Sequence, residues 1–187
     1  IFVAAILAAL YFATFGRMAK ADPAESIQLY CDAFVRQDEE AQKKLTSYGA
    51  PTDAFNMKAA FANALQTAGA NLSPEEAAEI GDAYMESLKN TSIETSVSNQ
   101  GEGQATVEVT VTRFNMMAAR EKATSLMRSR MKLNGTPEEL RKTAVDATAD
   151  AYRELQPMGM ATFYVPVRYN EKTRIWDPAD PVQFGFD

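Results

Sequence analysis

A strict alternation of apolar and polar residues near the middle of the chain constrains its fold more than any other feature of the sequence. Ala105, Val107, Val109 and Val111 alternate with threonine and glutamate. Because successive side chains of a strand point to opposite faces, this period of two predicts a β-strand with one buried and one solvated face. A sheet with a solvated face is typical of antiparallel pairing. We therefore expect an antiparallel sheet whose apolar face is covered by helices.

Shorter alternating segments predict the partners of this strand. Ile93, Thr95 and Val97 alternate before a turn over residues 98–103. Residues 163–169 and 174–177 predict a second hairpin at the end of the chain. Pro166 lies inside the first of these two segments and predicts an edge strand or a bulge, because proline has no N–H to donate to a ladder.

Amphipathic segments predict three helices before the first hairpin, over about residues 23–48, 52–68 and 74–88. Capping residues such as Asp22, Ser73 and Glu76 mark two of their starts. Two further helices, about 115–133 and 136–155, are expected between the hairpins. The predicted class is α+β, with N-terminal helices covering the sheet and a two-helix insertion before the last strands. The expected sheet core is Val107, Val109, Val111, Phe163, Val165 and Val167, facing Ile27, Phe34, Leu45, Ile80 and Tyr84.

The composition excludes several common chemistries. The 187 residues contain no histidine and one cysteine, Cys31, which removes histidine metal sites, Ser-His and Cys-His nucleophile pairs and any intramolecular disulfide. The formal net charge of -6 argues against a nucleic-acid partner, because phosphate binding needs a positive face. We therefore expect no metal and no cofactor, and we expect no enzymatic activity.

The first fifteen residues, Ile1 to Phe15, carry no charge, and they predict the location of the protein. A spanning helix needs roughly 20 apolar residues, so this run fits a membrane anchor over residues 1–18 if the apolar segment begins further upstream. Ala19-Lys20-Ala21 also fits a signal peptide cleaved before Asp22, and a buried core helix is a third alternative. We favour an uncleaved single-pass anchor that contacts the bilayer, followed by one domain over residues 22–187.

Two further patterns bear on how the chain is held at the membrane. Cys31 follows Gln28-Leu29-Tyr30 instead of the small residues of a lipoprotein signal, so it is expected to be a helix residue and not a lipid attachment site. Arg17 and Lys20 follow the apolar run, and by the positive-inside rule they would keep the domain in the cytoplasm unless basic residues upstream of the run outweigh them.

Charge is distributed unevenly along the sequence. Residues 22–108 contain 15 acidic and 5 basic residues, whereas residues 113–132 contain 6 basic and 1 acidic. The basic helix is either a solvated face or a contact for anionic lipid or an acidic partner. Its candidate interaction surface comprises Met116, Arg120, Lys122, Met127, Arg128, Arg130, Met131 and Lys132.

Motifs along residues 22–177 resemble a known superfamily. Pro23 to Tyr30 with Ala33-Phe34, the strand Gly103 to Val111, and Asn170-Glu171-Lys172 to Ile175-Trp176 are similar to segments of nuclear-transport-factor-2-like, or cystatin-like, extracytoplasmic proteins and lipoproteins of Gram-positive bacteria. The resemblance implies a curved antiparallel sheet wrapped by helices into a cone with a pocket, on the extracytoplasmic side. It implies no reaction.

Three functions follow from these observations. The favoured one is a non-enzymatic accessory subunit or interaction module of a membrane assembly, since Ala4, Ala5, Ala8 and Ala9 would let the anchor approach a protein partner in the membrane. The first alternative is an extracytoplasmic module that binds or senses a small ligand. The second is a secreted enzyme that uses Asp or Glu, such as Glu108, with tyrosines in the cone. The candidate pocket residues are Tyr30, Tyr84, Tyr152 and Tyr164.

We predict that the mature protein retains residues 1–18, because the uncharged run is interpreted as an anchor and not as a cleaved signal. Intact mass and N-terminal sequencing of the protein extracted from membranes test this. A mature N-terminus at Asp22 would contradict it.

Overall fold

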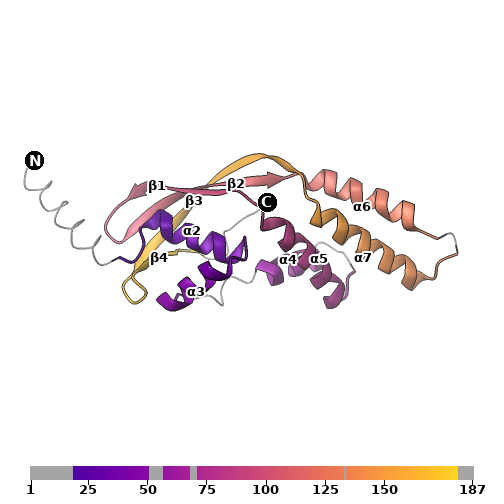
Figure 1. Cartoon of the computed structure of the whole chain (residues 1–187), viewed down its shortest axis with the longest axis horizontal. Coiled ribbons are helices and arrows are strands. Elements are labelled where there is room, and N and C mark those ends of the chain that lie inside the picture. Colours follow the sequence, from indigo (N-terminus) through magenta and orange to yellow (C-terminus); the bar gives the residue numbers. More distant parts are fainter. Residues whose placement is uncertain (1–18, 51–56, 68–70, 133, 181–187) are drawn as a thin grey trace, which may run out of the picture.

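The computed structural model describes residues 19–50, 57–67, 71–132 and 134–180. Within them it has six helices and a four-stranded antiparallel sheet (Figure 1), which confirms the α+β class. The helices are α2 (Pro23–Phe34), α3 (Glu39–Tyr48), α4 (Met57–Thr67), α5 (Pro74–Leu88), α6 (Met116–Arg130) and α7 (Pro137–Arg153). The strands are β1 (Ile93–Gln100), β2 (Gln104–Phe114), β3 (Pro157–Asn170) and β4 (Ile175–Pro178).

The strands pair in sequence order, β1-β2-β3-β4, and all three pairings are antiparallel. Val107 pairs with Val165, and Ala105 with Val167, so their side chains share one face of the sheet. Val107 and Val109 are completely buried, while Thr106, Glu108 and Thr110 on the other face remain partly accessible. The alternation in the sequence therefore correctly predicted the strand, its buried face and its antiparallel pairing.

Helix α2 covers the buried face and contacts β1, β2 and β4. Ile27 is fully buried there. Two polar contacts fix the helix against β4: the backbone N–H of Trp176 donates to Ser26 Oγ at 3.1 Å, and Tyr30 Oη donates to Asp177 Oδ1 at 2.7 Å. Asp22 caps the helix in a capping box with Glu25, as the sequence indicated for its start.

One long helix over residues 23–48 was expected, and this prediction is wrong. The chain breaks into α2 and α3 at Gln37, whose φ is +57°. The backbone N–H of Asp38 donates back to Asp32 O at 2.9 Å, and the Asp38 side chain then caps α3 by accepting from Ala41 N at 2.8 Å. An aspartate cap followed by Glu39 and Glu40 favours a new helix start over continuation.

Helix α5 is also placed differently from the prediction. Helix α5 contacts mainly α4 and α7, whereas α2 is the helix that lies on the sheet. Ile80 and Tyr84 are buried, but they join the common core from this second layer of helices. Phe34 and Phe163 are only partly buried and pack against the margin of the core.

Two strand details depart from the sequence pattern. Val97 is 40% exposed although it pairs with the buried Val107, and the register between β1 and β2 shifts just after it, between Val97 and Asn99. Pro166 lies in an inner strand, yet its carbonyl oxygen accepts from Ala179 N beyond the end of β4, which pairs only from Val167 onward. Before Val167, β3 has no paired strand on its β4 side, and Pro166 is tolerated at this point.

Two expectations fall outside the described residues: the membrane helix over residues 1–18, and the start of the second helix before Met57. Among the helices of the described ranges, none has both the length and the apolar character that a bilayer span requires.

We predict that Val109→Ala lowers the free energy of unfolding by about 2 kcal/mol, because it removes two buried methyl groups and leaves a cavity. The matched control is Val97→Ala, the same change at an exposed site of the neighbouring strand, which should alter stability by less than about 0.5 kcal/mol. Urea denaturation measures both. Equal losses for the two variants would show that the core faces are wrongly assigned.

Candidate interaction surface

The two predicted helices of the insertion form a hairpin, α6–α7, that extends the sheet along the long axis of the molecule (Figure 1). Asn115 fixes its base: its side chain caps α6 by accepting from Ala118 N at 2.9 Å, and its backbone N–H donates to Gln156 O at 2.9 Å. At the far end, Thr136 and Glu139 form a capping box that starts α7. Both ends of the hairpin are thus specified by local hydrogen bonds.

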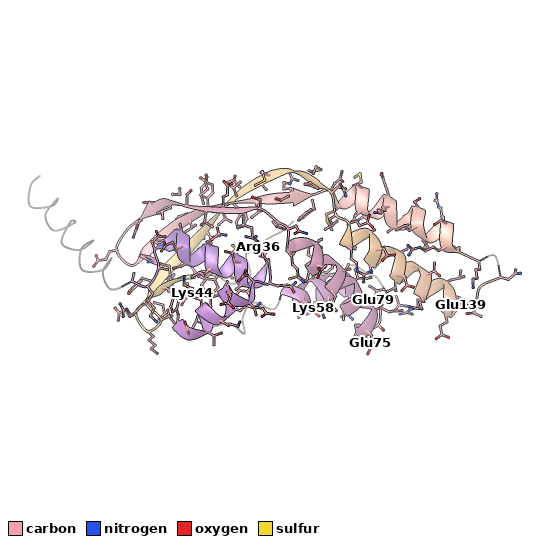
Figure 2. All side chains as sticks on the ribbon, viewed as in Figure 1. Arg36, Lys44, Lys58, Glu75, Glu79 and Glu139 are labelled. Carbon is pink, nitrogen blue, oxygen red and sulfur yellow. The ribbon has the colours of Figure 1, made fainter. Side chains whose placement is uncertain are left out.

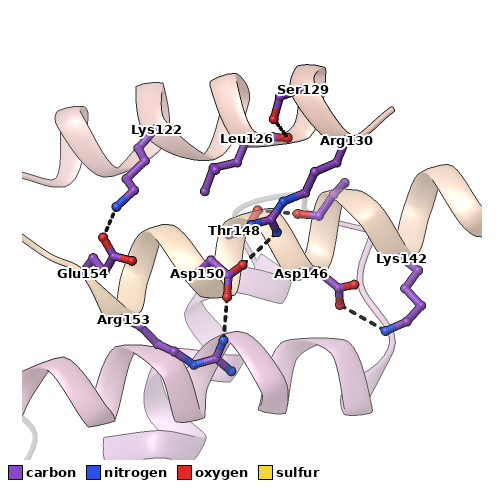
Figure 3. Close-up of polar contacts among 11 residues, drawn as sticks. Lys122, Leu126, Ser129, Arg130, Lys142, Asp146, Thr148, Asp150, Arg153 and Glu154 are labelled. Carbon is purple, nitrogen blue, oxygen red and sulfur yellow. Dashed lines mark hydrogen bonds and ion pairs between the residues drawn. The ribbon is translucent and has the colours of Figure 1, made fainter. Parts of the chain in front are cut away.

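The contact between α6 and α7 combines small apolar residues with ion pairs. Ala119 is the buried residue of α6, and α7 contributes Val145, Ala147, Ala149 and Ala151 to the interior. Lys122 pairs with Glu154, and Arg130 Nη1 with Asp150 Oδ2 at 2.7 Å (Figure 3). The hydrogen bond from Arg130 holds the pKa of the Asp150 carboxyl below its ordinary value, with Arg153 adding to the effect. These exposed pairs show which turns of α6 and α7 lie side by side, and they add little to stability.

The structure divides the eight predicted surface residues into two groups. Lys122 and Arg130 point toward α7 and are engaged in the pairs just described, while Met116 and Met127 are half-buried. Lys122 and Arg130 remain accessible but are paired with α7, and the two methionines are only partly accessible, so a contact of these four with a partner stays a prediction. The four that remain on the exposed surface are Arg120, Arg128, Met131 and Lys132.

Sequence reasoning missed the acidic residues that pair with α6. Asp150 and Glu154 are four residues apart and therefore share one face of the segment that ends α7. That spacing was readable beside the basic segment, and it is the signal that could have identified the ion pairs. Three exposed methionines were not predicted either: Met117, at the start of α6, is 73% exposed, and Met158 and Met160 in β3 are about half exposed.

The hairpin is attached to the rest of the protein through α7 and α5. Arg141 Nε donates to Glu76 Oε1 at 2.6 Å, and its Nη2 donates to the backbone oxygen of Asn71 at 2.9 Å. About two turns further along α5, Phe61 stacks on Tyr84 at 4.1 Å between ring centroids, and Tyr152 of α7 meets both rings edge-on. An ion pair and an aromatic cluster therefore hold α7 in place.

The four candidate pocket tyrosines are not brought together. Tyr84 and Tyr152 lie in the aromatic cluster, where burial raises the pKa of Tyr84 to about 12. Tyr30 is buried under β4, and burial together with its bond to Asp177 raises its pKa. Tyr164 is 59% exposed on the outer face of the sheet, where a hydrogen bond to Glu108 raises its pKa. Two of the four are in contact, and a pocket lined by these tyrosines stays a prediction.

Hollows in the described surface lie elsewhere. One of about 340 Å³ lies at the end of the sheet beside the β1–β2 turn, where Asn99, Gln104 and Arg168 line it. Another, of about 200 Å³, lies near the tip of the hairpin and includes Arg130 and Lys142. No group of three or more acidic or cysteine side chains within the described ranges is arranged to hold a metal ion.

Comparison with known proteins gives one structural likeness. No family model matches the chain, and no curated protein matches it. The crystal structure of a "putative lipoprotein (ycdA)" from Bacillus subtilis superposes with a TM-score of 0.70 at 19% sequence identity. The match covers 92% of this chain and 55% of that one, so this chain spans little more than half the length of that protein. At this identity the likeness shows a shared fold. Membership of the nuclear-transport-factor-2-like superfamily stays a prediction.

We predict that Arg141→Gln raises the pKa of the Glu76 carboxyl. The Arg141 hydrogen bond is the largest cause holding that pKa at about 2, below the ordinary 4.5. Because the folded-state pKa is lowered, the pair favours the folded state above the ordinary carboxyl pKa, and this contribution is lost as the pH falls toward 2.

Carboxyl ¹³C NMR titration of the folded protein measures this shift. Lys142→Gln is the control, since Lys142 is the adjacent exposed cation and pairs with Asp146 instead. An unchanged Glu76 titration in Arg141→Gln would show that the contact between α5 and α7 is not formed as described.

Proposed function

We propose that this chain is a membrane-anchored, extracytoplasmic protein that presents the α6–α7 hairpin as an interaction module of a larger membrane assembly. The observation that carries the proposal is the hairpin itself. It extends the sheet and has defined helix caps at both ends. Ion pairs join its two helices, and its outer helix, α6, contacts mainly α7. The hairpin therefore adds more exposed surface to the molecule than buried core.

Two further observations support the membrane address. The uncharged run from Ile1 to Phe15 has the composition of a membrane segment, and the described part of the chain shares its fold with a protein described as a lipoprotein. Lipoproteins are held at the outer surface of a membrane, so an extracytoplasmic domain follows by analogy of fold. Residues 1–18 serve as a single-pass anchor in this proposal, and no reaction is assigned to the domain.

A small-ligand module is the second candidate, and one observation favours it. The hollow of about 340 Å³ at the end of the sheet lies within the size range of small-molecule sites, and Arg168, Asn99 and Gln104 supply polar groups at its wall. Native mass spectrometry of the protein released from membranes would distinguish the two candidates. A stoichiometric small molecule favours the ligand module, and a stoichiometric protein favours the interaction module.

The proposed anchor and orientation are tested by fractionation and protease accessibility. We expect the full chain to remain in membranes after alkaline carbonate washing, and we expect protease added to intact cells to cleave it. Deletion of residues 1–18 should release the chain from the membrane. A full chain that is washed off by carbonate would contradict the anchor, and a chain protected until the cells are lysed would contradict the orientation.

A further inference from the structure

The outward face of α6 carries cations that the hairpin leaves unpaired. Lys122 and Arg130 are engaged with α7, whereas Arg120 and Arg128 are exposed and form no ion pair with any described residue. Lys132 follows the end of α6 and is exposed. The capping box of α7 holds the pKa of the Glu139 carboxyl below its ordinary value, and the charge of Lys132 adds to this effect. At 100° per residue, Arg128 lies on the side opposite to Ala119, the buried residue of α6. One carboxylate, Glu121, shares this outward face, which is therefore basic overall.

Exposed methionines surround the same region. The described part of the chain has six large hydrophobic residues classed as exposed, and four of them are methionines: Met117, Met131, Met158 and Met160. Met117 and Met131 lie at the two ends of α6, while Met158 and Met160 lie in the first part of β3, which starts beside the base of α6. Methionine adapts its shape to a contacting surface and recurs at protein-binding faces. Cations interspersed with methionines suit a partner that is both acidic and partly apolar.

The position of this face separates it from the anchored end of the chain. Residue Lys20 donates its backbone N–H to Arg174 O in the β3–β4 turn at 2.8 Å, and Tyr169 N donates to Gly103 O in the β1–β2 turn at 3.0 Å. The start of the described chain and both turns therefore lie at one end of the sheet. The α6–α7 hairpin extends from the other end (Figure 1).

The separation is large compared with the range of electrostatic forces. The 11 residues of β2 span about 37 Å at 3.4 Å each, and the 15 residues of α6 add about 22 Å at 1.5 Å each. The two elements run end to end in Figure 1. Exposed charges are screened within about 8 Å at physiological ionic strength. If residues 1–18 hold the chain in a bilayer, Arg128 and Lys132 lie at the end of the molecule away from Lys20, where the described chain begins.

We propose that the outward face of α6, with Met117, Arg120 and Arg128, together with Met131 and Lys132 just beyond its end, is a docking surface for an acidic, partly apolar protein surface and not for the bilayer that holds this chain. The inference rests on the proposed function, because it uses the anchor to orient the molecule. Charge complementarity and the methionines define the partner, and the distance from Lys20 places this surface at the end of the molecule away from the start of the described chain. Figure 2 shows Glu75 and Glu79 of α5 on the side of the molecule away from α6.

Site-specific crosslinking in intact cells tests the docking surface. A photoreactive amino acid is placed at Ser125, an exposed position of α6, in the full chain. We expect one predominant protein adduct, with a partner segment rich in Asp and Glu identified by mass spectrometry. Arg128→Glu with Lys132→Glu should reduce the adduct about tenfold or more, since like charges would then face each other across the contact. Thermal unfolding checks that the variant remains folded.

The matched control is Lys43→Glu with Lys44→Glu on α3, which makes the same change in charge at exposed sites of another helix and should leave the adduct unchanged. A lipid adduct, an adduct with a second copy of this chain, no adduct, or an adduct insensitive to the α6 charge reversal would each overturn the inference. Carbonate washing of the same cells tests the membrane anchor independently of the docking surface. A membrane-bound chain without an adduct contradicts only the docking surface, and an adduct from a chain released by carbonate contradicts the anchor.

Discussion

Strands β2 and β3 pair along almost their whole length, from Gln104 opposite Arg168 to Phe114 opposite Pro157, and this ladder determines where the rest of the molecule lies. Its buried face, with Val107 and Val109 at the centre, has to be covered, and α2 covers it. Its far end leads within two residues into α6 and receives the chain back from α7. The helical hairpin is therefore a continuation of a strand pair, and its direction follows from the direction of the ladder.

The same ladder explains why charges on α6 behave differently according to the side they face. Side chains directed at α7 meet Asp150 and Glu154 and are satisfied within the hairpin, while those directed away meet solvent. Exposed ion pairs contribute little to stability, whereas burial of Ala119 in the contact with α7 favours one rotation of α6 about its own axis. That rotation decides which cations face α7 and which face solvent. The composition of the outward face is thus a consequence of how α6 packs on α7.

Local rules were sufficient to predict most elements from the sequence. Period-two alternation located β2, and capping residues located the starts of α2, α5 and α7, because these signals depend on a few adjacent residues. The break between α2 and α3 was missed since Gln37, a residue without the conformational freedom of glycine, adopts a positive φ there. The dispersal of the tyrosines was missed for another reason. Which layer a helix joins is decided by tertiary packing, and Tyr84 belongs to a helix that packs on α7.

The basic segment on its own did not distinguish a cation paired with α7 from one that faces solvent. Arg128 and Arg130 are two residues apart and chemically identical, yet a helix places them about 200° apart around its axis. One reaches Asp150 on α7, and the other reaches no described acidic group. The basic residues of α6 therefore lie on two surfaces, one paired with α7 and one facing solvent. The packing of α7 shows that Arg130 pairs across the hairpin, whereas Arg128 faces solvent.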